Sequence, residues 1–197
     1  GTVLRNSWLM DMKARKNISS VILLLDTPGG ESRAASTSVS IIKNFNKPVL
    51  AYVDGMCASL GVWYSSACDE TYLGNELDEL GSVGSYATIV DFKGYFEKNG
   101  IKIHEIYAPQ STDKNKDYRD ALDGDYTLIE ADLKKHVDAF ISFVKNSRGD
   151  KAAASSKEWG SGKMFYAKDA VKLGLADGIK PFDQVVQKAA WLAKRKN

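Results

Sequence analysis

Apolar runs and helical patterns alternate along the first half of the chain. Residues 21–25 are all apolar, as is typical of a strand buried on both faces of a parallel sheet. A helical pattern over residues 34–45 follows, then a second apolar run over 49–53 and a helical pattern over 60–68. This alternation predicts a single α/β domain over residues 1–197, with a mainly parallel sheet and right-handed crossovers.

The rest of the chain gives weaker patterns, and it contains no internal repeat and no low-complexity linker. Gly100 follows a short helical pattern and suits a helix C-terminus. The further predicted elements are a helix over 8–16, a strand over 71–74, a turn and strand over 81–90, a helix over 92–99, an alternating strand over 101–107, a polar loop over 108–125, a long helix over 126–146, and C-terminal helices over 167–173 and 182–194.

Composition excludes several classes of protein. The 27 basic and 25 acidic residues leave a formal charge of +2, so we expect no nucleic-acid partner. No stretch approaches the roughly 18 apolar residues that span a bilayer, so membrane association is expected only through an upstream anchor. We expect a soluble domain that is cytoplasmic or membrane-associated through a missing segment. The cysteines and histidines lack metal-ligand spacing, so no metal or cofactor is expected, and Cys57 and Cys68 are interpreted as small buried residues.

Ser59 stands in a run rich in small residues, where a strand pattern gives way to a helix pattern. A serine at such a turn exposes its hydroxyl, and the neighbouring N–H groups and the start of the helix can stabilise an oxyanion. Pro28, Gly29 and Gly30 follow the preceding strand and form a tight turn with a bare backbone. Because sites in open α/β sheets collect at the carboxyl ends of strands, the two turns are expected to form one site.

A serine nucleophile needs a base at neutral pH. The only histidines are His104, in the predicted strand, and His136, in the long helix. The other solution is a lysine that desolvation keeps neutral, and the polar loop offers Lys114 and Lys116. The residues themselves leave these alternatives open.

Several short motifs, in order and at the right spacing over nearly the whole chain, resemble the signal peptide peptidase A family, which includes phage head-maturation proteases. The motifs are Asp26-Thr27-Pro28-Gly29-Gly30, Lys47-Pro48-Val49, Ala58-Ser59-Leu60-Gly61, Gly81-Ser82-Val83-Gly84, Asn99-Gly100-Ile101-Lys102, Ser147-Arg148-Gly149, the Gly162–Tyr166–Ala170 pattern and Gly174-Leu175-Ala176-Asp177.

This resemblance implies a Clp protease/crotonase-like fold and a Ser/Lys dyad peptidase that assembles into homo-oligomers and acts on peptides, such as signal peptide remnants or phage assembly proteins. It makes Ser59 the nucleophile and Lys114 the base, with Lys116 as the alternative. The family implies an oxyanion hole from the N–H groups of Gly30 and Leu60, with Gly29 as a further candidate. Ser82 is the candidate that orients the lysine.

The chain departs from the family pattern at several places. Leu60 stands where glycine is usual, the lysine loop lacks a Ser-Pro-like segment, and the first strand of the fold is expected upstream or from a neighbour. Two alternatives therefore stay open: an inactive scaffold of the same fold, and a crotonase-like acyl-CoA enzyme.

Overall fold

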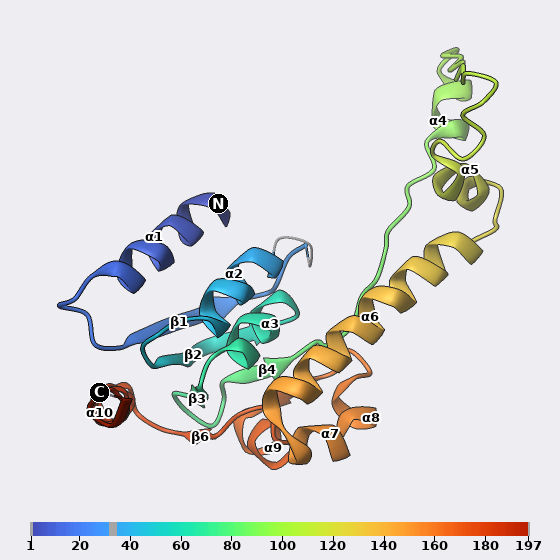
Figure 1. Cartoon of the computed structure of the whole chain (residues 1–197). Coiled ribbons are helices and arrows are strands. Elements are labelled where there is room, and N and C mark those ends of the chain that lie inside the picture. Colours follow the sequence, from blue (N-terminus) through green and yellow to red (C-terminus); the bar gives the residue numbers. More distant parts are fainter. Residues whose placement is uncertain (1, 32–34, 197) are drawn as a thin grey trace. The chain divides into compact units, whose positions relative to one another are not determined.

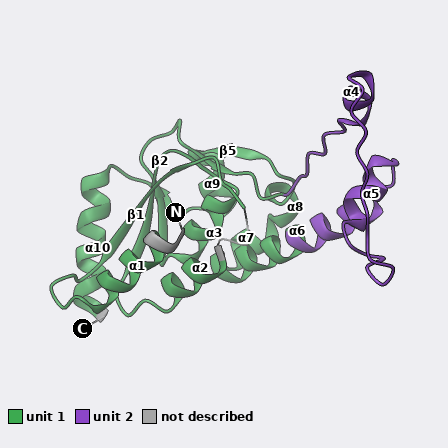
Figure 2. Ribbon diagram, turned by 90° about the horizontal axis from the view of Figure 1, so that it is seen from above, with its two compact units in different colours: residues 1–84, 137–197 green, residues 85–136 purple. Residues whose placement is uncertain are grey.

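The computed structural model describes residues 2–31 and 35–196 and divides the chain into two compact units (Figure 2). Unit 1 contains the chain up to Gly84 and from Val137 onward, and unit 2 contains Ser85–His136. Unit 1 holds the sheet and the helices that cover it, whereas unit 2 is built from helices and irregular chain (Figure 1). None of the described helices is both long enough and apolar enough to cross a membrane.

The sheet of unit 1 has six strands, and most of its pairs are parallel. Strand β2 (Val49–Ala58) is its centre: its first half pairs with β3 and its second half with β4, while β1 runs along its other side. The other strands are β1 (Val21–Thr27), β3 (Glu70–Leu73), β4 (Glu79–Gly81), β5 (Met164–Tyr166), antiparallel to β4, and β6 (Gly178–Ile179), parallel to β3.

Helices cover both faces of β2. Val49 and Ala51 face one cluster with residues of α1, α2 and α3, and Leu50 and Tyr52 face another with α10. The helices of unit 1 are α1 (Thr2–Ala14), α2 (Ala35–Lys43), α3 (Leu60–Ala67), α7 (Asp150–Ala154), α8 (Ser156–Trp159), α9 (Ala167–Lys172) and α10 (Phe182–Lys196), together with the C-terminal part of α6 (Thr127–Arg148).

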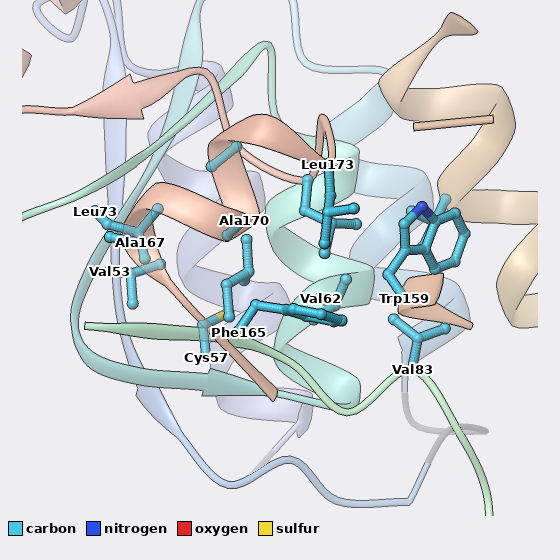
Figure 3. Close-up of a cluster of buried hydrophobic side chains, with 14 of the residues drawn as sticks. Val53, Cys57, Val62, Leu73, Val83, Trp159, Phe165, Ala167, Ala170 and Leu173 are labelled. Atoms are coloured by element: carbon cyan, nitrogen blue, oxygen red, sulfur yellow. The ribbon is translucent and has the colours of Figure 1, made fainter. Parts of the chain in front are cut away.

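The largest buried cluster lies under the second half of β2 and α3. In Figure 3 the side chains of Cys57 and Val62 lie beside Phe165, and that of Val53 lies near Leu73 and Ala167, so strand and helix residues meet the C-terminal part of the chain. Trp63 of α3 stacks between two rings of α6, with centroid distances of 4.8 Å to Phe140 and 4.7 Å to Phe143. The strand and the helix on either side of Ser59 thus pack against a core that the C-terminal part of the chain completes.

Most predicted elements are confirmed, but the strand at 49–53 is longer than predicted. It continues through Gly55 to Ala58 because a bulge, rather than a turn, follows Val53. The prediction that residues 21–25 are buried on both faces is wrong: Leu23 and Leu25 pack against buried clusters, but Leu24, which points to the opposite face, is 66% exposed. The predicted start of the next helix, Ala34, lies outside the described residues.

Two predicted strands are not formed. Residues 82–90 and 101–107 have no ladder partner among the described residues, and an alternating segment becomes a strand only when its backbone is paired. In unit 2, helix α4 (Lys93–Lys98) is followed by its C-cap Asn99 and then by Gly100, whose φ of 71° suits the predicted helix C-terminus. The polar loop over 108–125 contains a helix, α5 (Lys116–Leu122). The short elements α7, α8, β5 and β6 were not predicted, because two to five residues give no readable period.

Candidate active site

Three parallel strand ends meet at the candidate site. Thr27 of β1 lies opposite Cys57 of β2, and Ala58 of β2 lies opposite Gly81 of β4. Beyond these pairs the chain turns, and the N–H of Ser59 donates a 2.9 Å hydrogen bond to the carbonyl oxygen of Gly81. The Pro28–Gly30 turn, Ser59 and Ser82 therefore lie at one edge of the sheet, where ligands bind in open α/β sheets.

Ser59 has a backbone conformation that serine rarely adopts. Its φ is 50° and its ψ is −112°, and it immediately precedes the first residue of α3. Holding a non-glycine residue there costs on the order of 1–3 kcal/mol, and such strain clusters at active sites. The Ser59 hydroxyl forms no capping hydrogen bond with the helix, so its oxygen is not occupied by that role. A strained strand-to-helix turn is also how the nucleophile elbow presents a serine.

Gly29 lies directly against this serine. A β-carbon added to Gly29 would stand 2.7 Å from Cβ of Ser59 and 3.1 Å from the carbonyl oxygen of Ala58, and its φ of 111° also favours glycine. The N–H of Gly29 donates to Oγ1 of Thr27 at 3.2 Å and is therefore already engaged.

The two remaining oxyanion-hole candidates keep unused donors. Within residues 2–31 and 35–196, no acceptor is found for the N–H of Gly30 or of Leu60. Leu60 is the first residue of α3, so its N–H has no partner inside the helix. A β-carbon on Gly30 would lie 3.4 Å from Cδ2 of Leu60, so the two residues are neighbours. This geometry favours Gly30 and Leu60 over Gly29 as oxyanion donors.

Ser82 follows Gly81, where β4 ends, and is half-buried. Its N–H donates to the carbonyl oxygen of Lys163 at 2.8 Å, and its φ is 56°. A β-carbon on Gly81 would stand 2.4 Å from that same oxygen, so only glycine fits. Ser82 is thus fixed to the strand end that also binds the Ser59 backbone.

The candidate bases all belong to unit 2. Lys114 is exposed and forms no ion pair with any described residue, whereas Lys116 pairs with Asp120 on α5. His136 lies 3.8 Å from Asp132 on α6, and His104 is exposed in a segment without regular structure. Lys116 and His136 thus have local carboxylate partners, which leaves Lys114 as the lysine with the freer amine.

The cysteines are buried small residues, as expected. Sγ of Cys57 lies under the start of α3, where a β-carbon on Gly61 would stand 2.9 Å from it. Burial raises the pKa of the Cys57 thiol to about 12 and also raises that of Cys68. Gly61 belongs to the Ala58-Ser59-Leu60-Gly61 motif, which by itself gave it no role; its lack of a side chain lets α3 pack on β2. The described residues contain no cluster of three or more histidine, cysteine or acidic side chains that could hold a metal ion.

The fold is of the Clp protease/crotonase type, as predicted. A membrane-bound stomatin-specific protease, solved as a lysine-to-alanine mutant in complex with a substrate peptide, superposes with a TM-score of 0.62 at 17% identity, covering 95% of this chain and 72% of that chain. An enoyl-CoA hydratase/isomerase family member gives a TM-score of 0.55 at 18% identity, covering 98% and 65%. At these identities, the likeness establishes the fold alone.

Sequence comparison supplies the family. The model of peptidase family S49 matches residues 42–196, and the chain belongs to this family. A candidate protease of Methanocaldococcus jannaschii is 25% identical over 191 residues, which cover 96% of this chain and 61% of that protein. Protease 4 of Haemophilus influenzae is 22% identical over 184 residues, which cover 91% and 29%. The chain thus matches less than two thirds of the length of these relatives, 61% of one and 29% of the other.

Proposed function

We propose that this protein is a serine endopeptidase that uses a Ser59/Lys114 dyad. The observation that carries the proposal is the strained Ser59 turn beside Gly29 and Gly30, with its hydroxyl uncommitted to α3. Membership of peptidase family S49 supports a peptidase, and the lysine-to-alanine mutant of the structural neighbour, solved with a substrate peptide, supports a role for a lysine.

The reaction follows from the groups present. Oγ of Ser59 attacks the scissile carbonyl carbon while its proton passes to the amine of Lys114. The N–H groups of Gly30 and Leu60 stabilise the oxyanion of the tetrahedral intermediate. The C–N bond then breaks as the ammonium of Lys114 protonates the leaving amine, which leaves an acyl-enzyme on Ser59. Water, deprotonated by the same lysine, hydrolyses the ester and restores Ser59.

The expected partners are peptide substrates and further copies of the chain. Unit 2 supports self-association, because none of the described buried clusters contains a residue of 85–136. Several of its large apolar side chains are instead exposed, as for Ile106 at 93%, Tyr86 at 87% and Ile103 at 63%. Where such exposed apolar side chains gather, they favour an interaction surface. We propose that a second copy covers them, and light scattering of the wild type and an Ile103→Ser/Ile106→Ser variant tests this.

The function is tested by labelling with a fluorophosphonate and by hydrolysis of a fluorogenic peptide. Ser59→Ala should abolish labelling, and Ser59→Ala and Lys114→Ala should each reduce hydrolysis by at least about 10³-fold, since dyad members act as a unit. Lys116→Ala is the matched control and should retain activity. If Ser59→Ala is still labelled, Ser59 is not the nucleophile. If hydrolysis is lost in Lys116→Ala and kept in Lys114→Ala, Lys116 is the base. An intact oligomer without labelling or hydrolysis would favour the inactive scaffold.

The acyl-CoA alternative rests on the enoyl-CoA hydratase-like neighbours, which share the fold. The same Gly30 and Leu60 donors could hold a thioester oxyanion. Such an enzyme needs no serine nucleophile, so hydration of an enoyl thioester that persists in Ser59→Ala would favour it.

A further inference from the structure

The β1–β2 ladder contains a bulge that decides what lies beside Ser59. Leu25 pairs with Val53, but Thr27 pairs with Cys57, so β2 advances four residues where β1 advances two. Continued beyond the strands, the second register brings Gly29 opposite Ser59, where the close contact is found. The first register would have brought Gly29 opposite Cys57. The bulge therefore creates the meeting of the glycine turn and the serine.

Two carboxylates hold consecutive N–H groups of this bulge. Oδ1 of Asp26 on β1 accepts from the N–H of Met56 at 3.2 Å, and Oδ1 of Asp78, just before β4, accepts from the N–H of Gly55 at 2.9 Å. Gly55 has a φ of 105°, which suits the bulge. The bulge is thus anchored from both neighbouring strands.

Asp78 is the more buried and the more connected of the two. It is 3% exposed, and its Oδ2 accepts from the N–H groups of Gly74 at 2.8 Å and Asn75 at 2.9 Å. Its Oδ1 accepts from Nδ2 of Asn75 at 2.7 Å in addition to Gly55. Three of these four bonds build the local turn, and the fourth reaches 23 residues back along the chain to the bulge.

The Asp78–Gly55 bond also closes one end of the ladder that carries Ser59. Met56, Cys57 and Ala58 pair with Glu79, Leu80 and Gly81 in turn. The other end of this ladder is the hydrogen bond from Ser59 to Gly81. A slip at the first end would change the partner of Ser59 at the second, because register is shared along a ladder.

We propose that Asp78 is a positioning residue that fixes Ser59 for attack by pinning Gly55 and thereby the register of β2 against β4. The proposal rests on the proposed function in so far as Ser59 is the nucleophile. Asp78→Asn keeps the shape of the side chain but replaces one acceptor oxygen with a donor, so it cannot serve both the turn and the bulge. Misplacement of a reacting group by about 1 Å costs on the order of 100-fold in rate.

The test combines amide hydrogen exchange with peptide hydrolysis in the full chain. In Asp78→Asn, exchange at the Gly55 and Ser59 amides should become about tenfold faster, and kcat should fall about 10- to 100-fold with KM within about twofold. Glu76→Gln is the matched control: it lies in the same loop and loses only an exposed pair with Lys168, and should resemble wild type.

Wild-type exchange at Ser59 in Asp78→Asn would overturn the proposal, as would an unchanged kcat. If Asp78→Asn does not fold, Asp78→Ser, which can still accept from the turn but is too short for Gly55, should give the same two changes. Exchange at Ser59 does not depend on catalysis. A Ser59→Ala variant that still hydrolyses peptide would therefore refute the proposed function, while the exchange result would still decide the positioning role.

Discussion

Nη2 of Arg148 lies 2.9 Å from Oδ2 of Asp177, and the Arg148 side chain is only 6% exposed. The same carboxylate oxygen accepts from the N–H of Thr71, and Nε of Arg148 donates to the carbonyl oxygen of Gly174. The end of α6, the start of β3 and the turn after α9 are thus joined at one ion pair, in which the Arg148 side chain is buried and the Asp177 side chain is partly exposed.

We predict that Asp177→Asn destabilises the fold by about 3 kcal/mol, because removing one partner leaves the other charge buried. This figure is at the lower end of the usual range, since the Asp177 side chain is 35% exposed. Urea denaturation measures the effect. Lys168→Gln breaks an exposed pair with Glu76 and should cost less than about 1 kcal/mol. Equal losses in the two variants would contradict the prediction.

Gly29→Ala should lower kcat/KM by at least about 100-fold, because the added methyl group would displace Ser59 from its position. Peptide hydrolysis measures the effect. Gly162→Ala is the control that separates the effect of the close contact from the effect of backbone strain. Gly162 also has a positive φ, 84°, but nothing lies within 4 Å of a β-carbon added there. We expect Gly162→Ala to lose some stability and keep its activity. Comparable activity in the two variants would show that Gly29 is not needed beside Ser59.

Stability should fall with rising pH through the buried thiols. An unfolded thiol ionises near 9.0, whereas burial raises the pKa of Cys57 to about 12, so between these values the folded state holds a proton that the unfolded chain releases. The stabilisation is complete below about pH 9 and is lost as the pH rises towards 12. Urea midpoints at about pH 8 and about pH 10.5 measure the loss.

The pKa of Cys68 is raised for the same reason, so a Cys57→Ala/Cys68→Ala variant should show a smaller loss over this range. Iodoacetamide should label neither thiol in the folded wild type at about pH 8, since the thiolate is the reactive form. Rapid labelling of the native protein would disprove this.

Lys47 should contribute to stability through α1. Its ammonium donates to the carbonyl oxygens of Met12, Lys13 and Arg15 at 2.9, 3.0 and 2.6 Å, at the C-terminal end of the helix. We predict that Lys47→Met lowers the free energy of unfolding by about 2 kcal/mol, because three carbonyls lose a charged donor. Lys13→Met, which removes a single exposed bond to Asn44, is the control and should cost less than half as much. Thermal or urea unfolding gives both values.

Local patterns identified the helices and the small residues at the strand ends. Ser59 and Gly29 were found because a serine before a helix and a Pro-Gly-Gly turn after a strand are each contained in a few consecutive residues. The predicted strand over 101–107 failed for the opposite reason: alternation reports that a segment can pair, and not that a partner is present. The length of β2 was missed because its continuation through Gly55 depends on Asp26 and Asp78, which lie on other elements.

The sequence by itself determined the family resemblance, the strand–helix order and the candidate residues Ser59, Gly30 and Lys114, because each depends on neighbours along the chain. Only the tertiary structure decided the register that sets Gly29 against Ser59, since a two-residue bulge lies between strands far apart in sequence. It also decided that the N–H of Gly29 donates to Thr27, whereas the N–H of Gly30 has no acceptor among the described residues, because hydrogen-bond partners follow from three-dimensional geometry.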